Sequence, residues 1–180
     1  MKVFEQLAGD LVKIKTQNAQ ALEVAVTQTA EFAHNKLVDA IYDRYNFRFR
    51  DYISERITLK IDTKELEFRV ASRMRKSSSV NFMEGPVYRK SKNKRTPNKQ
   101  VIGGYTGSYL RGKTNHWRGA FLFTGLNGNL LMGYRNQGVK GREIPEVSYG
   151  VSVGGALGVV KDKQVDPVMT HLLNMYQKAL

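Results

Sequence analysis

The chain has 180 residues, a hydrophobic content of 41% and no cysteine. This length and composition suit one globular domain with a real core, and they exclude global disorder, disulfides, thiol nucleophiles and cysteine-ligated zinc. The formal net charge of +13 is concentrated, because residues 85–142 contain twelve Lys and Arg but no Asp or Glu. This acid-free block predicts contact with an anionic partner, or a place beside acidic parts of an assembly.

The sequence predicts neither a signal peptide nor a membrane span. Its first residues lack a continuous apolar core and include the acids Glu5 and Asp10. No apolar run approaches the about 18 residues that a spanning helix needs. We therefore expect a soluble intracellular product with no membrane partner.

The first third of the chain, residues 1–57, is predicted to be helical. Apolar residues recur every three or four positions from Asn18 to Tyr45, with no Gly or Pro between them. This pattern predicts a long helix with one apolar face. A shorter helix is expected ahead of it, with a break near Gly9 or Thr16.

Aromatic residues are dense where the long helix is expected to end. They are Tyr42, Tyr45, Phe47, Phe49 and Tyr52. We expect a packed helix corner, and the alternative is a base-stacking surface, although stacking platforms usually lie on sheets or loops. Asn46 or Asp51 is the expected cap of a short second helix that ends near Ile57.

The middle of the chain is predicted to change from strands to a basic arm. Residues 58–88 alternate apolar and polar side chains, which indicates strands. Residues 89–116 are predicted to be a basic loop or arm, because Arg89–Lys99 has no apolar residue with which to build a core. We expect that stretch to be exposed, and disordered when free. The glycine-rich Gly103–Gly107 lacks P-loop spacing and is interpreted as a flexible turn.

A β-hairpin is predicted over residues 117–136. Asn127 and Gly128 tolerate positive φ, as a tight hairpin turn requires. Residues 137–163 are predicted to be rich in loops. This leaves the last part of the chain, residues 164–180, for a closing element.

That closing element is predicted to be a helix. Asp166 is the expected N-cap, with Pro167 at the first helical position, and Leu172 and Met175 belong to an apolar face. Together these elements predict an α+β fold of one domain, residues 1–180. In it, a long N-terminal helix and a C-terminal helix pack on a small, mostly antiparallel β-sheet that carries an extended basic arm.

The sequence gives little support for catalysis. His34, His116 and His171 do not form a close ligand pair, and no carboxylate lies in the acid-free block. General acid–base chemistry and Mg²⁺-dependent cleavage both need such groups in clusters. We therefore expect no enzyme, no cofactor, and no catalytic or metal-binding residue.

The cations of the acid-free block are the candidate binding residues. They could neutralise phosphates and release counterions, and they alternate with aromatics such as Tyr105, Tyr109 and Trp117 in a mixture suited to nucleic acid. An acidic protein surface is an equally good target for the same charges. The candidate contacts are Arg89, Lys90, Lys92, Lys94, Arg95, Lys99, Arg111, Lys113, Arg118, Lys140 and Arg142.

The C-terminal half carries short motifs in a distinctive order. They are Trp117-Arg118-Gly119-Ala120-Phe121-Leu122, Asn127-Gly128, the strand Leu131–Arg135, the basic loop Lys140-Gly141-Arg142, Glu143-Ile144-Pro145 and an amphipathic end. This order, with the helical first third and a basic helix that runs into a strand over Arg50–Lys60, resembles the minor tail protein Z group of tailed bacteriophages and related tail-completion proteins. That group has a Pro-Ile order where this chain has Ile144-Pro145, and Val151–Val159 has no clear counterpart in it.

The resemblance implies a structural virion protein rather than an enzyme. Such a protein would be assembled in the host cytoplasm and would sit at the head-proximal end of the tail, where it helps to join tail to head. Its implied partners are further copies of itself in a closed ring, six-fold by expectation, with the tail terminator, tail tube or connector, and genomic DNA in the channel. The alternative is a basic nucleic-acid-binding protein of ribosomal or nucleoid type. The long apolar-striped helix, which looks suited to subunit packing, disfavours this alternative.

Overall fold

The computed structural model describes residues 2–97, 99–135 and 145–180, with side chains described from Thr16 onward. The helices are α1 (Lys2–Arg44), α2 (Arg50–Ser54), α3 (Val153–Val160) and α4 (Val165–Ala179), with 3₁₀ turns η1 (Ser79–Phe82) and η2 (Lys161–Gln164). The strands are β1 (Ile57–Asp62), β2 (Glu67–Ser72), β3 (Met83–Lys90), β4 (Gln100–Gly107), β5 (Asn115–Arg118), β6 (Phe121–Thr124), β7 (Leu130–Tyr134) and β8 (Glu146–Val147). The predicted α+β fold is confirmed.

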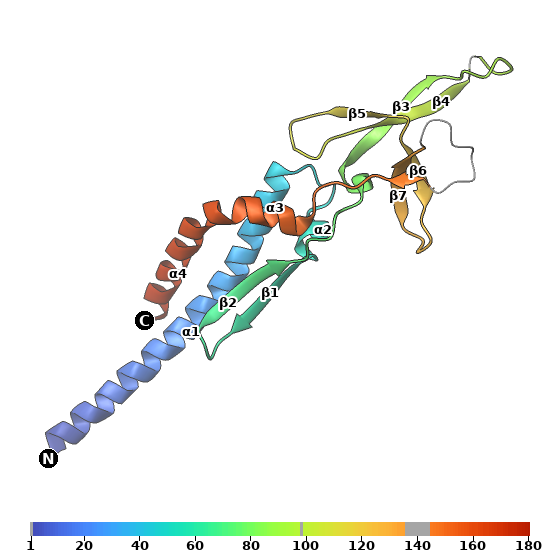
Figure 1. The fold of residues 1–180 in the computed structure, drawn as a ribbon. Coiled ribbons are helices and arrows are strands. Elements are labelled where there is room, and N and C mark those ends of the chain that lie inside the picture. The colour runs from blue at the N-terminus through green and yellow to red at the C-terminus, as the bar shows by residue number, and fades with distance from the viewer. Residues whose placement is uncertain (1, 98, 136–144) are drawn as a thin grey trace.

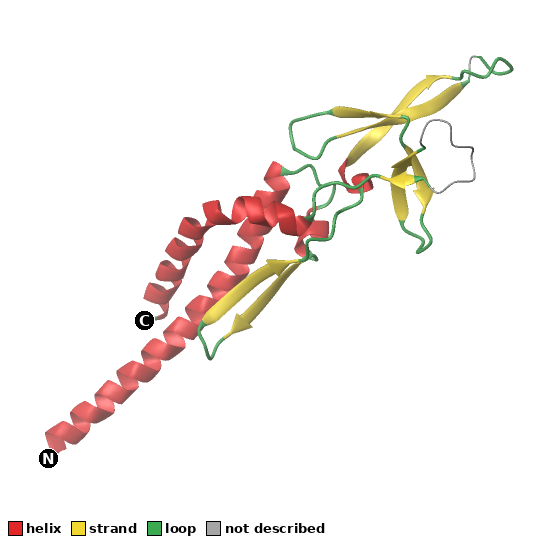
Figure 2. Cartoon of the chain, in the orientation of Figure 1, coloured by secondary structure: helices red, strands yellow, loops and turns green. Residues whose placement is uncertain are grey.

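The molecule is elongated, with its two kinds of structure separated along its length. Helices α1, α3 and α4 lie together at one end, with the β1–β2 ribbon alongside them, and the remaining strands form the other end (Figures 1 and 2). Instead of the single sheet predicted, the strands of the described ranges form three separate antiparallel sheets, in the orders β1-β2, β3-β4-β5 and β6-β7-β8. None of the helices in the described ranges combines the length and apolarity that crossing a bilayer requires.

Helix α1 is one continuous helix of 43 residues, so the predicted break near Gly9 or Thr16 is wrong. A single glycine costs a helix only about 1 kcal/mol relative to alanine, which a helix of this length tolerates. The predicted apolar face is confirmed, since Val26, Ala30 and Ile41 are buried along it. Figure 1 shows that the N-terminal part of α1 extends past α4 and the β1–β2 ribbon.

Helix α4 runs back along α1, as the predicted C-terminal helix (Figure 1). The ring of His171 stacks on that of Phe32 with centroids 4.0 Å apart, and Leu172 and Met175 are half-buried beside it. The predicted Asp166 cap is wrong. The helix continues directly from η2, so Asp166 falls in its first turn and no side chain caps it.

Helix α3 lies within the segment that was predicted to be rich in loops. The hydroxyl of Ser152 accepts a hydrogen bond of 3.0 Å from the Gly155 N–H and so caps the helix. Gly154 lies so close to the carbonyl of Arg73 that an added Cβ would be 2.8 Å from its oxygen. The apolar residues of α3 are largely buried in the main core. The helix was not predicted because its sequence is rich in glycine.

The aromatic segment forms a packed corner, as predicted, rather than a stacking platform. Phe47 and Phe82 are each 1% exposed, with ring centroids 4.5 Å apart, and Tyr109 meets Phe82 edge-on at 5.2 Å. The hydroxyl of buried Ser79 lies 3.0 Å from that of Tyr109 and 2.9 Å from that of Ser148. This cluster, the central joint, connects the helical end to the strands.

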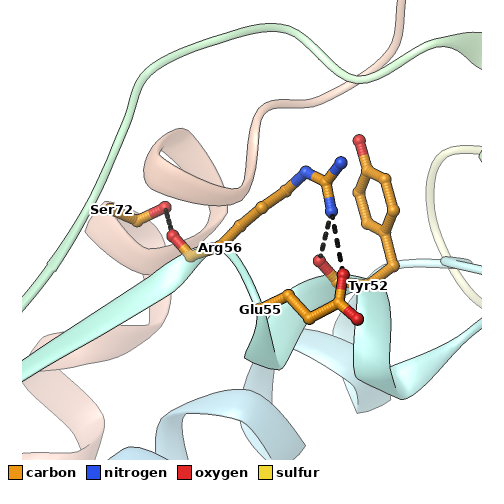
Figure 3. A network of polar contacts seen from close by, with 4 residues as sticks. All are labelled: Tyr52, Glu55, Arg56 and Ser72. Atoms are coloured by element: carbon orange, nitrogen blue, oxygen red, sulfur yellow. Dashed lines mark hydrogen bonds and ion pairs between the residues drawn. The ribbon is translucent and has the colours of Figure 1, made fainter.

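Helix α2 ends at Ser54 and is flanked by Phe49, so neither Asn46 nor Asp51 caps it as predicted. A polar network then fixes the passage into β1 (Figure 3). Arg56 donates to the Tyr52 carbonyl at 3.1 Å and holds its guanidinium 3.5 Å from the centre of the Tyr52 ring. The Arg56 carbonyl accepts a hydrogen bond of 2.7 Å from Ser72, which ties α2 to the end of β2.

Residues Gly103–Gly107 lie in β4, so their interpretation as a flexible turn is wrong. The pairing of β4 with β3 is irregular between Val87 and Tyr88, and Gly104, which lies opposite Val87, adopts a φ of +148°. A Cβ on Gly104 would lie 2.3 Å from the carbonyl oxygen of Trp117. Glycine is needed in this strand because neighbouring groups approach its backbone closely.

The predicted hairpin is confirmed as β6 and β7, with a longer turn than expected. The Gly128 N–H donates to Gly125 O at 2.9 Å, and the Gly125 N–H donates to Asn129 O at 2.8 Å. Only Gly128 of the predicted Asn-Gly pair has a positive φ, of +74°. These bonds describe a three-residue loop with glycine in the left-handed position.

Candidate cationic interface

Strand β4 pairs with β5 from Gly104 onward, and its outer part forms a two-stranded ribbon with β3 that protrudes from the strand end of the molecule (Figure 1). The loop between β3 and β4, which was predicted to be exposed and disordered when free, closes with hydrogen-bonded turns. The Ser91 N–H donates to Lys99 O at 2.8 Å, and the Asn93 side chain accepts from the Arg95 N–H at 3.0 Å. We call residues 89–99 the hairpin tip.

All six cations of the hairpin tip are exposed, as the sequence predicts. They are Arg89, Lys90, Lys92, Lys94, Arg95 and Lys99. Arg89 and Lys90 are neighbours on one strand and so lie on opposite faces of the ribbon. The stem of Arg89 lies across Gly103 of β4, where a Cβ would be 2.7 Å from it.

No cation of the hairpin tip has an ionic partner within the part of the chain that the structure describes. Ion pairs in that part instead lie toward the helical end, where Arg50 meets Asp39 at 2.7 Å and Arg69 meets Glu67 at 2.8 Å. With no acid in residues 85–142, nothing along that stretch of sequence offsets the charge of the tip. The tip therefore concentrates a positive potential that can attract an anionic partner.

Arg111 lies at the joint, away from the hairpin tip. Its Nε donates to Tyr42 O at 2.9 Å and its backbone N–H donates to Arg44 O at 3.1 Å. Both carbonyls belong to the last turn of α1, which lacks helical partners. The guanidinium also lies 4.3 Å from the centre of the Tyr42 ring, so Arg111 caps α1 and anchors the loop before β5.

The remaining candidates are divided by the fold. Arg118 is exposed at the end of β5, where it pairs with Gly104. On its other side Gly104 pairs with Val87, two residues before Arg89. Lys113 is exposed in the loop before β5. Lys140 and Arg142 lie outside the described residues. The structure thus brings six candidates together at the tip, with Arg118 near the base of the ribbon.

The aromatics that alternate with these cations belong to the core. Tyr105 is buried, and Trp117 packs on Tyr109 with ring centroids 5.6 Å apart. Both Tyr105 and Trp117 contact the small cluster around Met132. The mixture of aromatics and cations in the sequence is therefore not a mixture on the surface.

No protein family, curated protein or solved structure matches the chain. Its function must be argued from its own surfaces. Within the described ranges, no group of three or more His, Asp or Glu side chains could hold a metal ion. Of the histidines, His171 stacks in the helical end and His116 is exposed on β5 opposite Thr106.

A second uncovered surface lies on α4, and the sequence prediction missed it. Val165, Met169 and Leu173 are 53%, 50% and 57% exposed, and Leu180 follows them at 69%. Val165, Met169 and Leu173 follow one another at intervals of four residues, so they lie along one side of the helix, next to its half-buried face on α1, and Leu180 follows at the C-cap. We call these residues the α4 row. The four-residue spacing of Val165, Met169 and Leu173 is the sequence pattern from which this row could have been predicted.

Proposed function

We propose that this chain is a structural virion protein of a tailed bacteriophage, a tail-completion or minor tail protein at the head-proximal end of the tail. There it would form a closed ring, six-fold by expectation, that helps to join tail to head and lines or closes the DNA channel. The tail terminator, tail tube or connector would be its protein neighbours. The order of motifs from Trp117 to Pro145 motivates the family, and the uncovered surfaces support an assembly subunit.

The observation that carries the proposal is the α4 row together with the part of α1 that extends past α4. Residues 16–20 of α1 are all exposed, and Ala21 is the first buried residue after them. Helices in proteins owe most of their stability to packing of an apolar face. Part of α1 extends beyond the rest of the folded chain, and the apolar side chains of the α4 row are exposed. Both features suit contacts between copies.

Two different surfaces that fit one another produce a ring when the rotation between copies closes. In such a ring the hairpin tips repeat once per copy, so weak contacts of each tip add through effective concentration. The tips lie at the opposite end of the molecule from the helices (Figure 1). One end can therefore hold neighbouring copies while the other meets DNA or an acidic protein.

The proposal is tested in the phage or prophage that encodes the chain. Mass spectrometry of purified tails should detect the protein, and labelled antibody should decorate the head-proximal end in particle images. Deleting the gene should leave heads and tails unjoined, and a plasmid copy should restore joining. Absence of the protein from purified virions and tails would refute the proposal.

Self-association is tested with two charge-matched pairs of substitutions. Met169→Glu with Leu173→Glu places two acids on the α4 row, whereas Asn174→Glu with Gln177→Glu places two on exposed polar positions of the same helix. Sedimentation should show smaller assemblies for the first pair only. Equal behaviour of the two pairs would mean that the row is not an interface.

The second candidate is a free nucleic-acid-binding protein of ribosomal or nucleoid type. The observation that favours it is the hairpin tip, whose cations have no ionic partner among the described residues. It differs from the first candidate in location, because the protein would be found on cellular nucleic acid and not in particles. A protein that stays monomeric and is absent from tails would support it.

A further inference from the structure

We propose that the hairpin tip binds the phosphate backbone of duplex DNA without reading its sequence. The inference builds on the proposed function, in which duplex DNA fills the tail channel, and it commits to DNA rather than an acidic protein. Three features support it: the composition of the tip, the presence of cations on both faces of the ribbon, and the burial of the nearby aromatics in the core.

The composition of the tip suits phosphates better than a protein surface. The centres of protein interfaces are enriched in aromatic residues and depleted of lysine. Residues 89–99 have no aromatic residue and no Ala, Val, Leu, Ile or Met, and four of their six cations are lysines. A surface of this kind gains its affinity from the release of counterions around a polyanion.

The ribbon places these cations where two rows of phosphates can be met at once. The major groove of B-DNA admits a two-stranded β-ribbon, with a phosphate backbone along each wall. Arg89 lies on one face of the ribbon and Lys90 on the other, and Lys92, Lys94 and Arg95 surround the end. A ribbon entering the groove by its tip therefore presents charge to both walls.

The same geometry disfavours a single strand. Binding of single strands relies on several exposed aromatics on which successive bases stack. Tyr105 and Trp117 are held in the core, and the described residues of the ribbon expose one aromatic, Tyr88, opposite Ile102 and behind the tip. One ring cannot form a stacking row, so contacts to the backbone remain.

The test measures binding of the full chain to a labelled 30-base-pair duplex of arbitrary sequence between 50 and 200 mM NaCl. Six phosphate contacts predict a slope of log K against log salt of about −5, or a loss of affinity of about 10³-fold over this range. Replacing Lys92, Lys94, Arg95 and Lys99 together by Gln should reduce the magnitude of the slope by about 3 to 4.

A matched control carries the same change of charge elsewhere. Lys60, Lys64, Lys161 and Lys163 are exposed toward the helical end, and their joint replacement by Gln gives the same net charge. This variant should keep the slope of the parent. Circular dichroism and sedimentation should show that both variants keep the fold and the assembly state.

Several outcomes would overturn the proposal. They are an unchanged slope in the tip variant, a single strand of the same length that binds as tightly as the duplex, and poly-glutamate of equal charge that competes as well as DNA. The last result would identify an acidic protein partner. If the chain is found in tails but does not bind duplex, the inference fails and the virion proposal stands. If it binds duplex but is absent from virions, the inference stands and the second candidate function is supported.

Discussion

Removing the Phe82 ring should strongly destabilise the protein, because this side chain fills the central joint. It is 1% exposed and contacts the rings of Phe47 and Tyr109. Its ring also lies under Gly150, where an added Cβ would be 2.5 Å from it. Phe82→Ala would therefore leave a cavity bordered by the helical corner, the loop before β5 and residues 148–150.

The expected loss is about 4 kcal/mol of unfolding free energy. Phenylalanine-to-alanine changes in cores cost about 3 to 5 kcal/mol, and each aromatic pair adds about 0.5 to 1.5 kcal/mol to the burial of area alone. Domains of this size lose about 2 to 4 °C of melting temperature per kcal/mol. The melting temperature should then fall by about 8 to 16 °C.

The measurement is urea unfolding followed by circular dichroism, with calorimetry for the melting temperature. Phe49→Ala is the control, because Phe49 is 58% exposed and should change stability by no more than about 0.5 kcal/mol. If residues 1–180 form one domain, the parent should unfold in a single transition. A loss below about 1 kcal/mol for Phe82→Ala, or equal losses for the two variants, would refute this account of the joint.

Three further substitutions, the first with a matched control, test separate features. Gly104→Ala should cost about 2 kcal/mol or more, because its Cβ would meet a backbone oxygen at 2.3 Å and its φ is +148°. Gly85→Ala, with nothing within 4 Å, should be nearly neutral in the same urea assay. Arg111→Ala should cost about 1 to 2 kcal/mol through lost contacts to Tyr42, yet leave the salt slope of DNA binding unchanged. Burial, and then the charge of Tyr109, raise the pKa of Tyr134 above its ordinary 10.0. The folded state therefore holds this proton more tightly, so its contribution to stability is complete below pH 10 and is lost as the pH rises above it. Tyr134→Phe should flatten that alkaline decline, and an unchanged profile would contradict the assignment.

The periodic elements could be predicted from the sequence, because the repeat of the side chains directly reflects which face is buried. This holds for α1, α4, β1–β2 and the β6–β7 hairpin. Glycine misled the prediction three times. It suggested a break near Gly9, a turn at Gly103–Gly107 and a loop over α3. At Gly104, Gly107 and Gly154, other backbone or side-chain atoms approach so closely that only a glycine fits.

The candidate site could be located along the sequence, but the sequence could not distinguish cations with a structural role from cations that are free to bind a partner. Lys92 and Arg111 are both basic residues of one acid-free block. Only the fold reveals that Arg111 caps a helix through Tyr42, 69 positions earlier in the chain, while Lys92 remains exposed at the hairpin tip. The α4 row was missed because the apolar face predicted for α4 included Leu172 and Met175 but not the neighbouring Val165, Met169 and Leu173, which the fold leaves exposed.

Helix α4 contains no fully buried residue, although it lies along a helix whose own side chains are buried as deeply as any in the core. Elements with few buried contacts open at a lower free energy than the rest of a domain. The backbone amides of α4 should therefore exchange with deuterium well before those of α1 around Val38 and Ile41. Each opening would uncover the strip of α1 near Phe32 and leave a vacancy that the corresponding helix of another copy can occupy. If the proposed ring forms, this opening is the step through which two copies could exchange their α4 segments.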